Sequence, residues 1–204
     1  MIHQTLGDSN KKTKRGRRIM KVGIFGGTLD PFSVGHAAVV QNAFEQLNLD
    51  KIYIVPTTVN YYRKDKRYLF TFDEKVRIIQ DFITSFDKPV EIDTIEKDKD
   101  GSWRTIDLVQ YFEKKHPDDE LFLIIGEDSY REFKTWTRWQ DILTYVNLCV
   151  AGRGLRLGED PEIPTLRINM GNKFEECSAT NTRNKLIEEL IELYLSDKDW
   201  YNGI

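Results

Sequence analysis

The chain has 204 residues, of which 40% are hydrophobic and 31% are charged, so it is long enough to form one domain with a substantial core. No apolar run approaches the roughly 18 residues that a membrane helix needs. The net charge is −3, but residues 1–20 carry +5, which leaves −8 for the remainder. An acidic body argues against nucleic acid as the main partner.

The first twenty residues differ in composition from everything that follows. The basic run "KKTKRGRR" (11–18) could bind nucleic acid or an anionic surface, although such runs are more often solvated. The start of the chain also lacks the apolar segment of a signal peptide. We therefore expect residues 1–20 to be a basic, disordered extension, residues 21–204 to form a single domain, and the protein to be cytoplasmic.

Short apolar runs alternate with helical patterns through the rest of the chain. The expected strands lie at 21–25, 51–56, 90–95, 120–126, 147–152 and 165–169. The expected helices lie at 36–48, 72–86, 105–116, 137–146 and 180–195. This alternation predicts an α/β fold, a Rossmann-like open parallel sheet with helices on both faces. Such sheets bind ligands beyond the carboxyl ends of their strands.

Two stretches follow strands and should meet in one crevice. The stretch "GIFGGTLDPFSVGH" (23–36) contains Gly26, Gly27 and Thr28, a plausible phosphate cradle, although two glycines alone could form only a tight turn. His36 should lie near the start of the first helix, where anions bind and where an imidazole can donate to a phosphate oxygen. The strand at 120–126 ends at Gly126, which is followed by Glu127 and Asp128.

The chain has two cysteines, and neither has the spacing of a metal ligand. Cys149 lies in an apolar run and is expected to be a small buried hydrophobic residue. Cys177 is the other cysteine. No zinc site is expected, and the predicted site contains no metal ligands.

Several stretches resemble one enzyme superfamily. "GGTLDPFSVGH" (26–36) resembles the signature of the (H/T)xGH nucleotidyltransferases, and "SATNTRNKL" (178–186) resembles their Ser-x-Thr-x-x-Arg stretch. Within that superfamily, "IIGEDSYREFKTWTRWQDIL" (124–143) and "VAGRG" (150–154) resemble the nicotinate-nucleotide adenylyltransferase family. The resemblance covers residues 21 to about 204.

The resemblance implies that ATP and nicotinate mononucleotide react to give nicotinate adenine dinucleotide and pyrophosphate in NAD biosynthesis. The attacking phosphate has a second pKa of about 6, so it needs no general base. Catalysis then depends on positioning and electrostatics. ATP also implies a divalent cation, Mg²⁺, which offsets its charge. No metal cage made only of protein groups is expected.

The resemblance assigns His36 and Arg183 to catalysis. The residues that it places on ATP are Gly26, Gly27, Thr28, Ser33, His36, Gly126, Asp128, Arg153, Ser178, Thr180 and Arg183. Ser33 departs from the usual motif, since it keeps a hydroxyl but lacks an imidazole, and it could be only a turn hydroxyl. Thr180 and Asp128 could instead be ordinary helix caps.

The acceptor side departs most from the family pattern. The residues expected to bind the pyridine nucleotide are Arg63, Trp103, Arg104, Thr105 and Trp136. The stretch "NYYRKDKR" (60–67) places Arg63 at the family's basic position, although it could be a solvated charge run. Arg104, or a backbone N–H beside it, is hypothesised to meet the nicotinate carboxylate. Trp136 could stack on the pyridine ring or belong to the core.

Three alternatives remain open. The acceptor could be nicotinamide mononucleotide, or the protein could be another small-molecule nucleotidyltransferase, such as a phosphopantetheine adenylyltransferase. The third alternative is a nucleotide-binding sensor without turnover. ATP and a pyridine mononucleotide are the expected partners, with neither nucleic acid nor a membrane involved.

Overall fold

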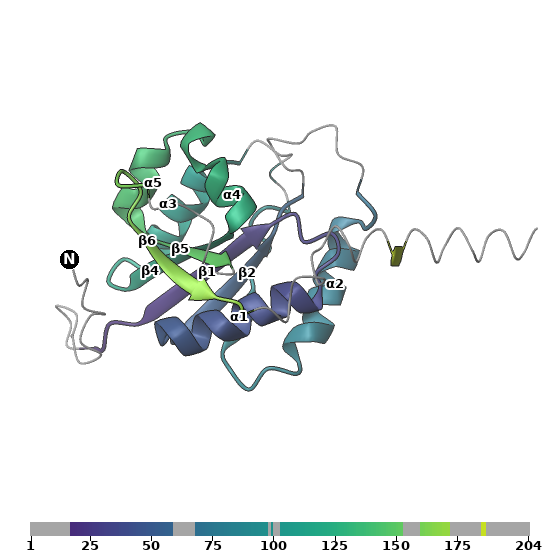
Figure 1. Ribbon diagram of the computed structural model, residues 1–204. Helices are drawn as coiled ribbons and strands as arrows, with labels where there is room; N and C mark the ends of the chain where they lie inside the picture. The colour runs from purple at the N-terminus through teal and green to yellow at the C-terminus, as the bar shows by residue number, and fades with distance from the viewer. Residues whose placement is uncertain are drawn as a thin grey trace, which may run out of the picture.

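The computed structural model describes residues 17–58, 68–97, 99, 103–152, 160–171 and 185–186. Its centre is a six-stranded sheet in which every pair of neighbouring strands is parallel, in the order β3-β2-β1-β4-β5-β6 (Figure 1). The strands are β1 (Lys21–Gly27), β2 (Lys51–Pro56), β3 (Val90–Ile92), β4 (Glu120–Gly126), β5 (Asn147–Gly152) and β6 (Thr165–Asn169). Strands β1, β2, β4 and β5 are buried along most of their length, as near-continuous apolar runs predict.

Helices cover both faces of the sheet, and each face has its own apolar cluster. One cluster contains residues of α1 (Val34–Leu47) and α2 (Phe72–Ile83). The other contains residues of α3 (Thr105–Lys115), α4 (Glu127–Arg131), the 3₁₀ turn η2 (Phe133–Thr135) and α5 (Trp139–Tyr145). The predicted fold class, an open parallel sheet with helices on both faces, is therefore confirmed.

The boundaries differ from the sequence-based expectations in a few places. Strand β3 ends at Ile92 rather than at residue 95, α1 begins at Val34 rather than at His36, and α2 ends at Ile83. The elements α4 and η2 were not predicted, because five and three residues are too few to show a helical repeat. Residues 185 and 186 are helical, and the rest of the helix expected at 180–195 lies outside the described residues.

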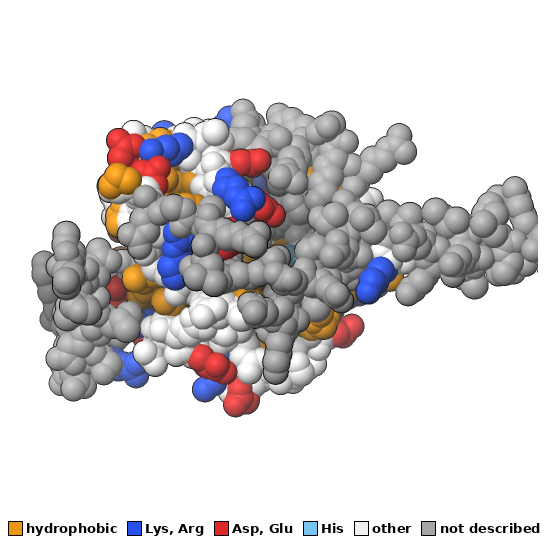
Figure 2. Space-filling view, viewed as in Figure 1, with side chains coloured by type: hydrophobic (Ala, Val, Ile, Leu, Met, Phe, Trp, Pro, Cys, Tyr) orange, Lys and Arg blue, Asp and Glu red, His pale blue; other side chains and the backbone are white. Residues whose placement is uncertain are grey.

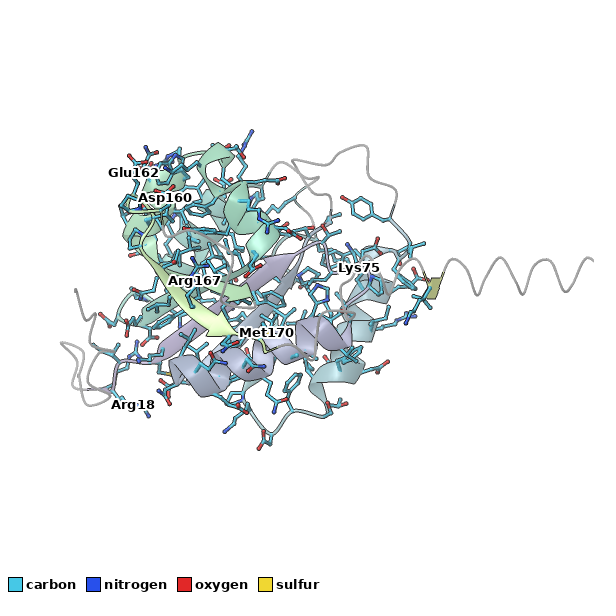
Figure 3. All side chains as sticks on the ribbon, in the orientation of Figure 1. Arg18, Lys75, Asp160, Glu162, Arg167 and Met170 are labelled. Atoms are coloured by element: carbon cyan, nitrogen blue, oxygen red, sulfur yellow. The ribbon has the colours of Figure 1, made fainter. Side chains whose placement is uncertain are left out.

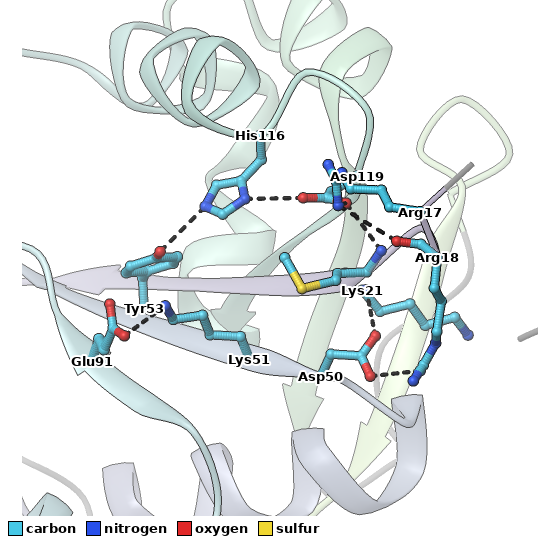
Figure 4. A network of polar contacts seen from close by, with 10 residues as sticks. Arg17, Arg18, Lys21, Asp50, Lys51, Tyr53, Glu91, His116 and Asp119 are labelled. Carbon is cyan, nitrogen blue, oxygen red and sulfur yellow. Dashed lines mark hydrogen bonds and ion pairs between the residues drawn. The ribbon is translucent and has the colours of Figure 1, made fainter. Parts of the chain in front are cut away.

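Two aspartates hold the start of β1 at the amino edge of the sheet (Figure 4). Asp119 accepts hydrogen bonds from the Met20 N–H (3.0 Å) and the Arg17 guanidinium (2.8 Å). Asp50 accepts from the Lys21 N–H (2.9 Å) and from Arg18 (2.6 Å). Residues 17–20, which were placed in the expected extension, are therefore hydrogen-bonded to the domain.

Charged groups of both signs are interspersed on one face of the molecule (Figure 2). On the face shown in Figure 2, the Lys and Arg side chains of the described residues lie among Asp and Glu side chains. None of the helices in the described ranges is both long enough and apolar enough to span a membrane. Cys149 is fully buried, as predicted, and burial raises the pKa of its thiol to about 12.

Candidate functional site

The order of the strands places a crevice between β1 and β4. The chain adds β2 and β3 on one side of β1, then crosses to β4, β5 and β6 on the other side. The carboxyl ends of β1 and β4, at Gly27 and Gly126, therefore lie at the point where the winding direction reverses. In open α/β sheets this is the place where ligands bind.

The predicted glycine positions lie at the carboxyl ends of β1 and β4. Among the described residues, no atom outside the adjoining chain lies within 4 Å of a Cβ built on Gly126. A Cβ at Gly26 would lie 3.4 Å from Leu108 Cδ2, at ordinary contact distance. The Gly27 carbonyl accepts the Thr57 N–H at 2.9 Å, which fixes the start of the turn against the exit of β2.

We call residues 26–32 the glycine turn. The N-terminus of α1 follows this turn and carries no acidic side chain in its first turn. The other four α-helices in the described residues each have at least one there. The partial positive charge of a helix N-terminus is normally offset by such a carboxylate or by a bound anion. The first turn of α1 is therefore the described helix start best suited to an anionic ligand.

His36 lies in that first turn, and its ring is fixed from three sides. The ring stacks on Phe32 with centroids 5.3 Å apart and lies 5.9 Å from the ring of Phe25. Its Nδ1 accepts the backbone N–H of Ser33 at 3.0 Å. This contact places the proton of the neutral imidazole on Nε2, so Nε2–H is the hydrogen-bond donor.

Burial makes His36 neutral at physiological pH. Desolvation lowers the pKa of its imidazole from 6.5 to about 4, although the residue keeps some solvent exposure. A neutral ring with a protonated Nε2 can donate a hydrogen bond but does not carry a full positive charge. The arrangement therefore suits a donor better than a cation or a general base.

Ser33, the residue that departs from the usual motif, is the N-cap of α1 and is 3% exposed. Its Oγ lies 3.1 Å from His36 Nδ1. The hydroxyl thus contacts the imidazole as well as the helix start. A contact between Ser33 and ATP stays a prediction.

The exit of β4 leads directly into α4. The N-cap of this helix is Gly126, and Asp128 is its second residue, so Asp128 is not the cap that one alternative expected. Its side chain is 93% exposed and lies 3.4 Å from Arg131. Glu127 crosses to the end of β5, where a Cβ on Gly152 would overlap its carboxylate.

The predicted acceptor residues that the structure describes lie on the α3 side of the sheet. Arg104 is the N-cap of α3, and its N–H donates to Asp107 Oδ2 at 2.9 Å, while Thr105 is the first helical residue. Trp103 and Trp136 are partly buried and pack against the apolar cluster on this face. Trp136 also lies 5.2 Å from the Phe133 ring, so it contacts the core while keeping an exposed part.

The remaining predicted site residues lie outside the described ranges. They are Arg63, Arg153, Ser178, Thr180 and Arg183. The structure therefore brings the glycine turn, His36 and the exit of β4 to one edge of the sheet. The arginines stay predictions.

Sequence reasoning missed two buried ionisable residues close to this edge. Lys75 is 1% exposed and Glu96 is 9% exposed. Burial raises the pKa of the Glu96 carboxyl to about 7, although the positive charge of Lys75 opposes this rise. Lys75 lies four residues before Ile79 on the apolar side of α2, and a lysine at that position was the available signal.

Replacing Glu96 with glutamine is expected to change how stability depends on pH. The pKa of Glu96 is about 7 in the folded chain and 4.5 ordinarily, so the folded state holds a proton that the unfolded state has released between these values. The wild type should therefore lose about 3 kcal/mol of unfolding free energy as pH rises through this window. Glu96→Gln should escape that loss.

Urea unfolding at pH 4.5 and pH 8 measures this effect. The variant should gain on the wild type between the two pH values, and Glu45→Gln, at an exposed position of α1, serves as the control. Parallel pH dependence in the wild type and in Glu96→Gln would show that the carboxyl titrates normally.

The sequence is similar to a family model and to several known proteins. The cytidylyltransferase-like family model matches residues 24–191, a range that includes both signature stretches. A "Probable nicotinate-nucleotide adenylyltransferase" of Fusobacterium nucleatum is 30% identical over 174 residues, which are 82% of this chain and 88% of the relative. Another of the same name, from Albidiferax ferrireducens, is 34% identical over 139 residues, 68% of each chain. This chain belongs to the nicotinate-nucleotide adenylyltransferase family.

The fold of this chain is also found in a solved structure of a nicotinic acid mononucleotide adenylyltransferase. Nicotinic acid mononucleotide adenylyltransferase of Plasmodium falciparum, solved in complex with NaAD, superposes with a TM-score of 0.59 at 20% identity. The match covers 74% of this chain and 75% of that one. The recognised family and the fold therefore agree.

Proposed function

We propose that the chain transfers the adenylyl group of ATP to nicotinate mononucleotide, releasing pyrophosphate and forming nicotinate adenine dinucleotide. The reaction is a step of NAD biosynthesis, which we place in the cytoplasm, where ATP is made and used. The observation that carries the proposal is the neutral His36 ring, with its Nε2–H at the N-terminus of α1 beside the glycine turn.

The chemistry fits a neutral donor. A phosphate oxygen of the mononucleotide attacks the α-phosphorus of ATP, and the bond from that phosphorus to the bridging oxygen of the β-phosphate breaks. The attacking phosphate is already mostly a dianion near pH 7, so no proton has to be removed from it. His36 donates from Nε2 to an α-phosphate oxygen and stabilises the charge that builds up there.

The rest of the ATP site is formed by residues of the two signature stretches, of the exit of β4 and of the stretch 150–154. Gly26, Gly27 and Thr28 offer backbone N–H groups to the phosphates, and Gly126 and Asp128 lie beside the ribose. Arg153, Ser178, Thr180 and Arg183 hold the β- and γ-phosphates. Arg183 completes catalysis by offsetting the charge of the departing pyrophosphate.

A divalent cation, Mg²⁺, enters with ATP and neutralises part of the triphosphate charge. Among the described residues there is no group of three or more His, Cys, Asp or Glu side chains that could hold a metal ion. The phosphate oxygens of ATP are the ligands proposed for this cation.

The pyridine nucleotide binds against the start of α3. Arg63 holds its phosphate, Trp103 and Trp136 contact the pyridine ring, and Arg104 with Thr105 meets the carboxylate. Support comes from the position of Arg104 at the start of α3, where its guanidinium is a suitable partner for a carboxylate.

One assay tests the proposed reaction. The protein is mixed with Mg²⁺, ATP and one acceptor at a time, and pyrophosphate release is followed with nicotinate mononucleotide, nicotinamide mononucleotide and phosphopantetheine. Rapid release with nicotinate mononucleotide is expected. Release with phosphopantetheine alone would change the assigned acceptor, and ATP binding without release in any mixture would indicate a sensor.

A further inference from the structure

The buried Lys75 connects two loops of the nucleotide site. Its Nζ donates to the carbonyl oxygen of Thr57, just after β2, at 2.6 Å and to that of Thr28, just after β1, at 3.3 Å. Figure 3 labels the side chain on α2. Thr28 belongs to the glycine turn, so one ammonium group ties this turn to the neighbouring strand exit.

The surroundings of Lys75 show that it is built into the fold. The side chain is 1% exposed, and its ammonium lies 5.1 Å from the Tyr68 ring centroid and 6.0 Å from that of Phe72. Removing an ammonium from water is costly unless hydrogen bonds and nearby negative groups compensate. The two carbonyls compensate for this cost. The charge of Lys75 also acts on Glu96, whose pKa it lowers against the effect of burial.

A second link joins the same helix to the same turn. The carboxylate of Asp30 accepts the backbone N–H groups of Leu69 and Phe70, both at 3.0 Å. These residues lead into the N-cap of α2, Thr71, whose hydroxyl accepts the Glu74 N–H. The start of α2 is therefore fixed to the glycine turn at two points, through Asp30 and through Lys75.

We infer that Lys75 is a positioning residue, which holds the glycine turn in the place where it can bind the phosphates of ATP. The inference rests on the proposed function for the identity of the ligand. Lys75 itself is too buried to reach a substrate, so it acts through the backbone of Thr28 and Thr57. Misplacing catalytic groups by about 1 Å can reduce a rate by up to about a hundredfold.

The test compares Lys75→Met, which keeps an unbranched side chain one atom shorter and has no donor, with Lys75→Gln, which is equally short but keeps N–H donors without the charge. Adenylyl transfer is measured at a temperature where each variant is folded, as shown by its urea unfolding curve. We expect kcat to fall by about ten- to a hundredfold for Lys75→Met and less for Lys75→Gln. The KM of the acceptor should stay within about threefold, since the described residues proposed to contact its pyridine ring, Trp103 and Trp136, pack on the other face of the sheet.

Hydrogen exchange separates positioning from general stability. The Thr57 N–H, which bonds to Gly27, should exchange faster in Lys75→Met, while amides in the middle of β4 and β5 keep their protection. Ile142→Val, a core change in α5, should lower stability without this local effect or a change in kcat.

Each result supports or overturns the inference. A folded Lys75→Met with kcat within twofold of the wild type would overturn it, as would faster exchange spread evenly over the sheet. If Lys75→Met does not fold, Lys75→Gln decides, and its wild-type kcat would be the contrary result. If the wild type itself shows no transfer, the proposed function fails. The effect of Lys75 on the glycine turn is then measured as the ATP affinity of each variant relative to the wild type.

Discussion

Replacing His36 with alanine is expected to lower kcat by about 10² to 10³, with the protein still folded. The imidazole is held by Phe25, Phe32 and the Ser33 N–H, so its Nε2–H is oriented before ATP binds. Removing one such preorganised donor to developing charge has an effect of this size in other enzymes. The measurement is kcat for pyrophosphate release at saturating ATP and acceptor.

His116 provides the matched control for this experiment. Its ring contacts Asp119 and the Tyr53 hydroxyl near the amino edge of the sheet, away from the glycine turn (Figure 4). His116→Ala should therefore keep kcat within about threefold of the wild type even if stability falls. A His36→Ala enzyme with nearly wild-type kcat would show that the imidazole makes no contact with the reacting phosphate.

Replacing Arg104 with glutamine is expected to reduce the preference for the acid nucleotide over the amide by about ten- to a hundredfold. A hydrogen bond between charged groups contributes about 1.5–3 kcal/mol, and each 1.4 kcal/mol corresponds to about tenfold in affinity. The measurement is the ratio of kcat/KM for nicotinate and nicotinamide mononucleotides, in the wild type and in the variant.

A second variant separates this contact from a general loss of positive charge. Arg77, exposed on α2, lies on the opposite face of the sheet, and Arg77→Gln should leave the ratio unchanged. An unchanged ratio in Arg104→Gln would indicate that a backbone N–H beside Arg104, and not its side chain, recognises the carboxylate. Comparable rates for both nucleotides in the wild type would remove the hypothesis altogether.

The order of strands and helices could be predicted because it depends on local patterns. An apolar run such as 120–126 and a helical spacing such as that of 105–116 can be recognised from neighbouring residues alone. The alternation of such runs and helices predicts the parallel sheet. The crevice followed from the same reasoning, since glycines directly after two strands must lie at one edge. Elements as short as α4 carry too few residues for their period to be recognised.

The protonation state of His36 could not be predicted from the sequence. Phe25, a residue of β1, lies against the imidazole and helps to bury it. The Ser33 N–H bonds to Nδ1 only once the start of α1 has folded. The role of Lys75 depends likewise on two carbonyls that are 29 residues apart in the chain, at Thr28 and Thr57. The protonation state of His36 and the role of Lys75 both depend on groups that come together only in the folded chain. The motifs could be located because their residues are close together in the sequence.

In the proposed site, the glycine turn, the exit of β4 and the helix expected at residues 180–195 act on one triphosphate. A crystal structure with a non-hydrolysable ATP analogue and nicotinate mononucleotide tests it most directly. We expect His36 Nε2 to lie within hydrogen-bond distance of an α-phosphate oxygen and the Arg183 guanidinium to contact the β- or γ-phosphate of the same nucleotide. A bound triphosphate that contacts neither side chain, or His36 and Arg183 too far apart to share one nucleotide, would contradict it.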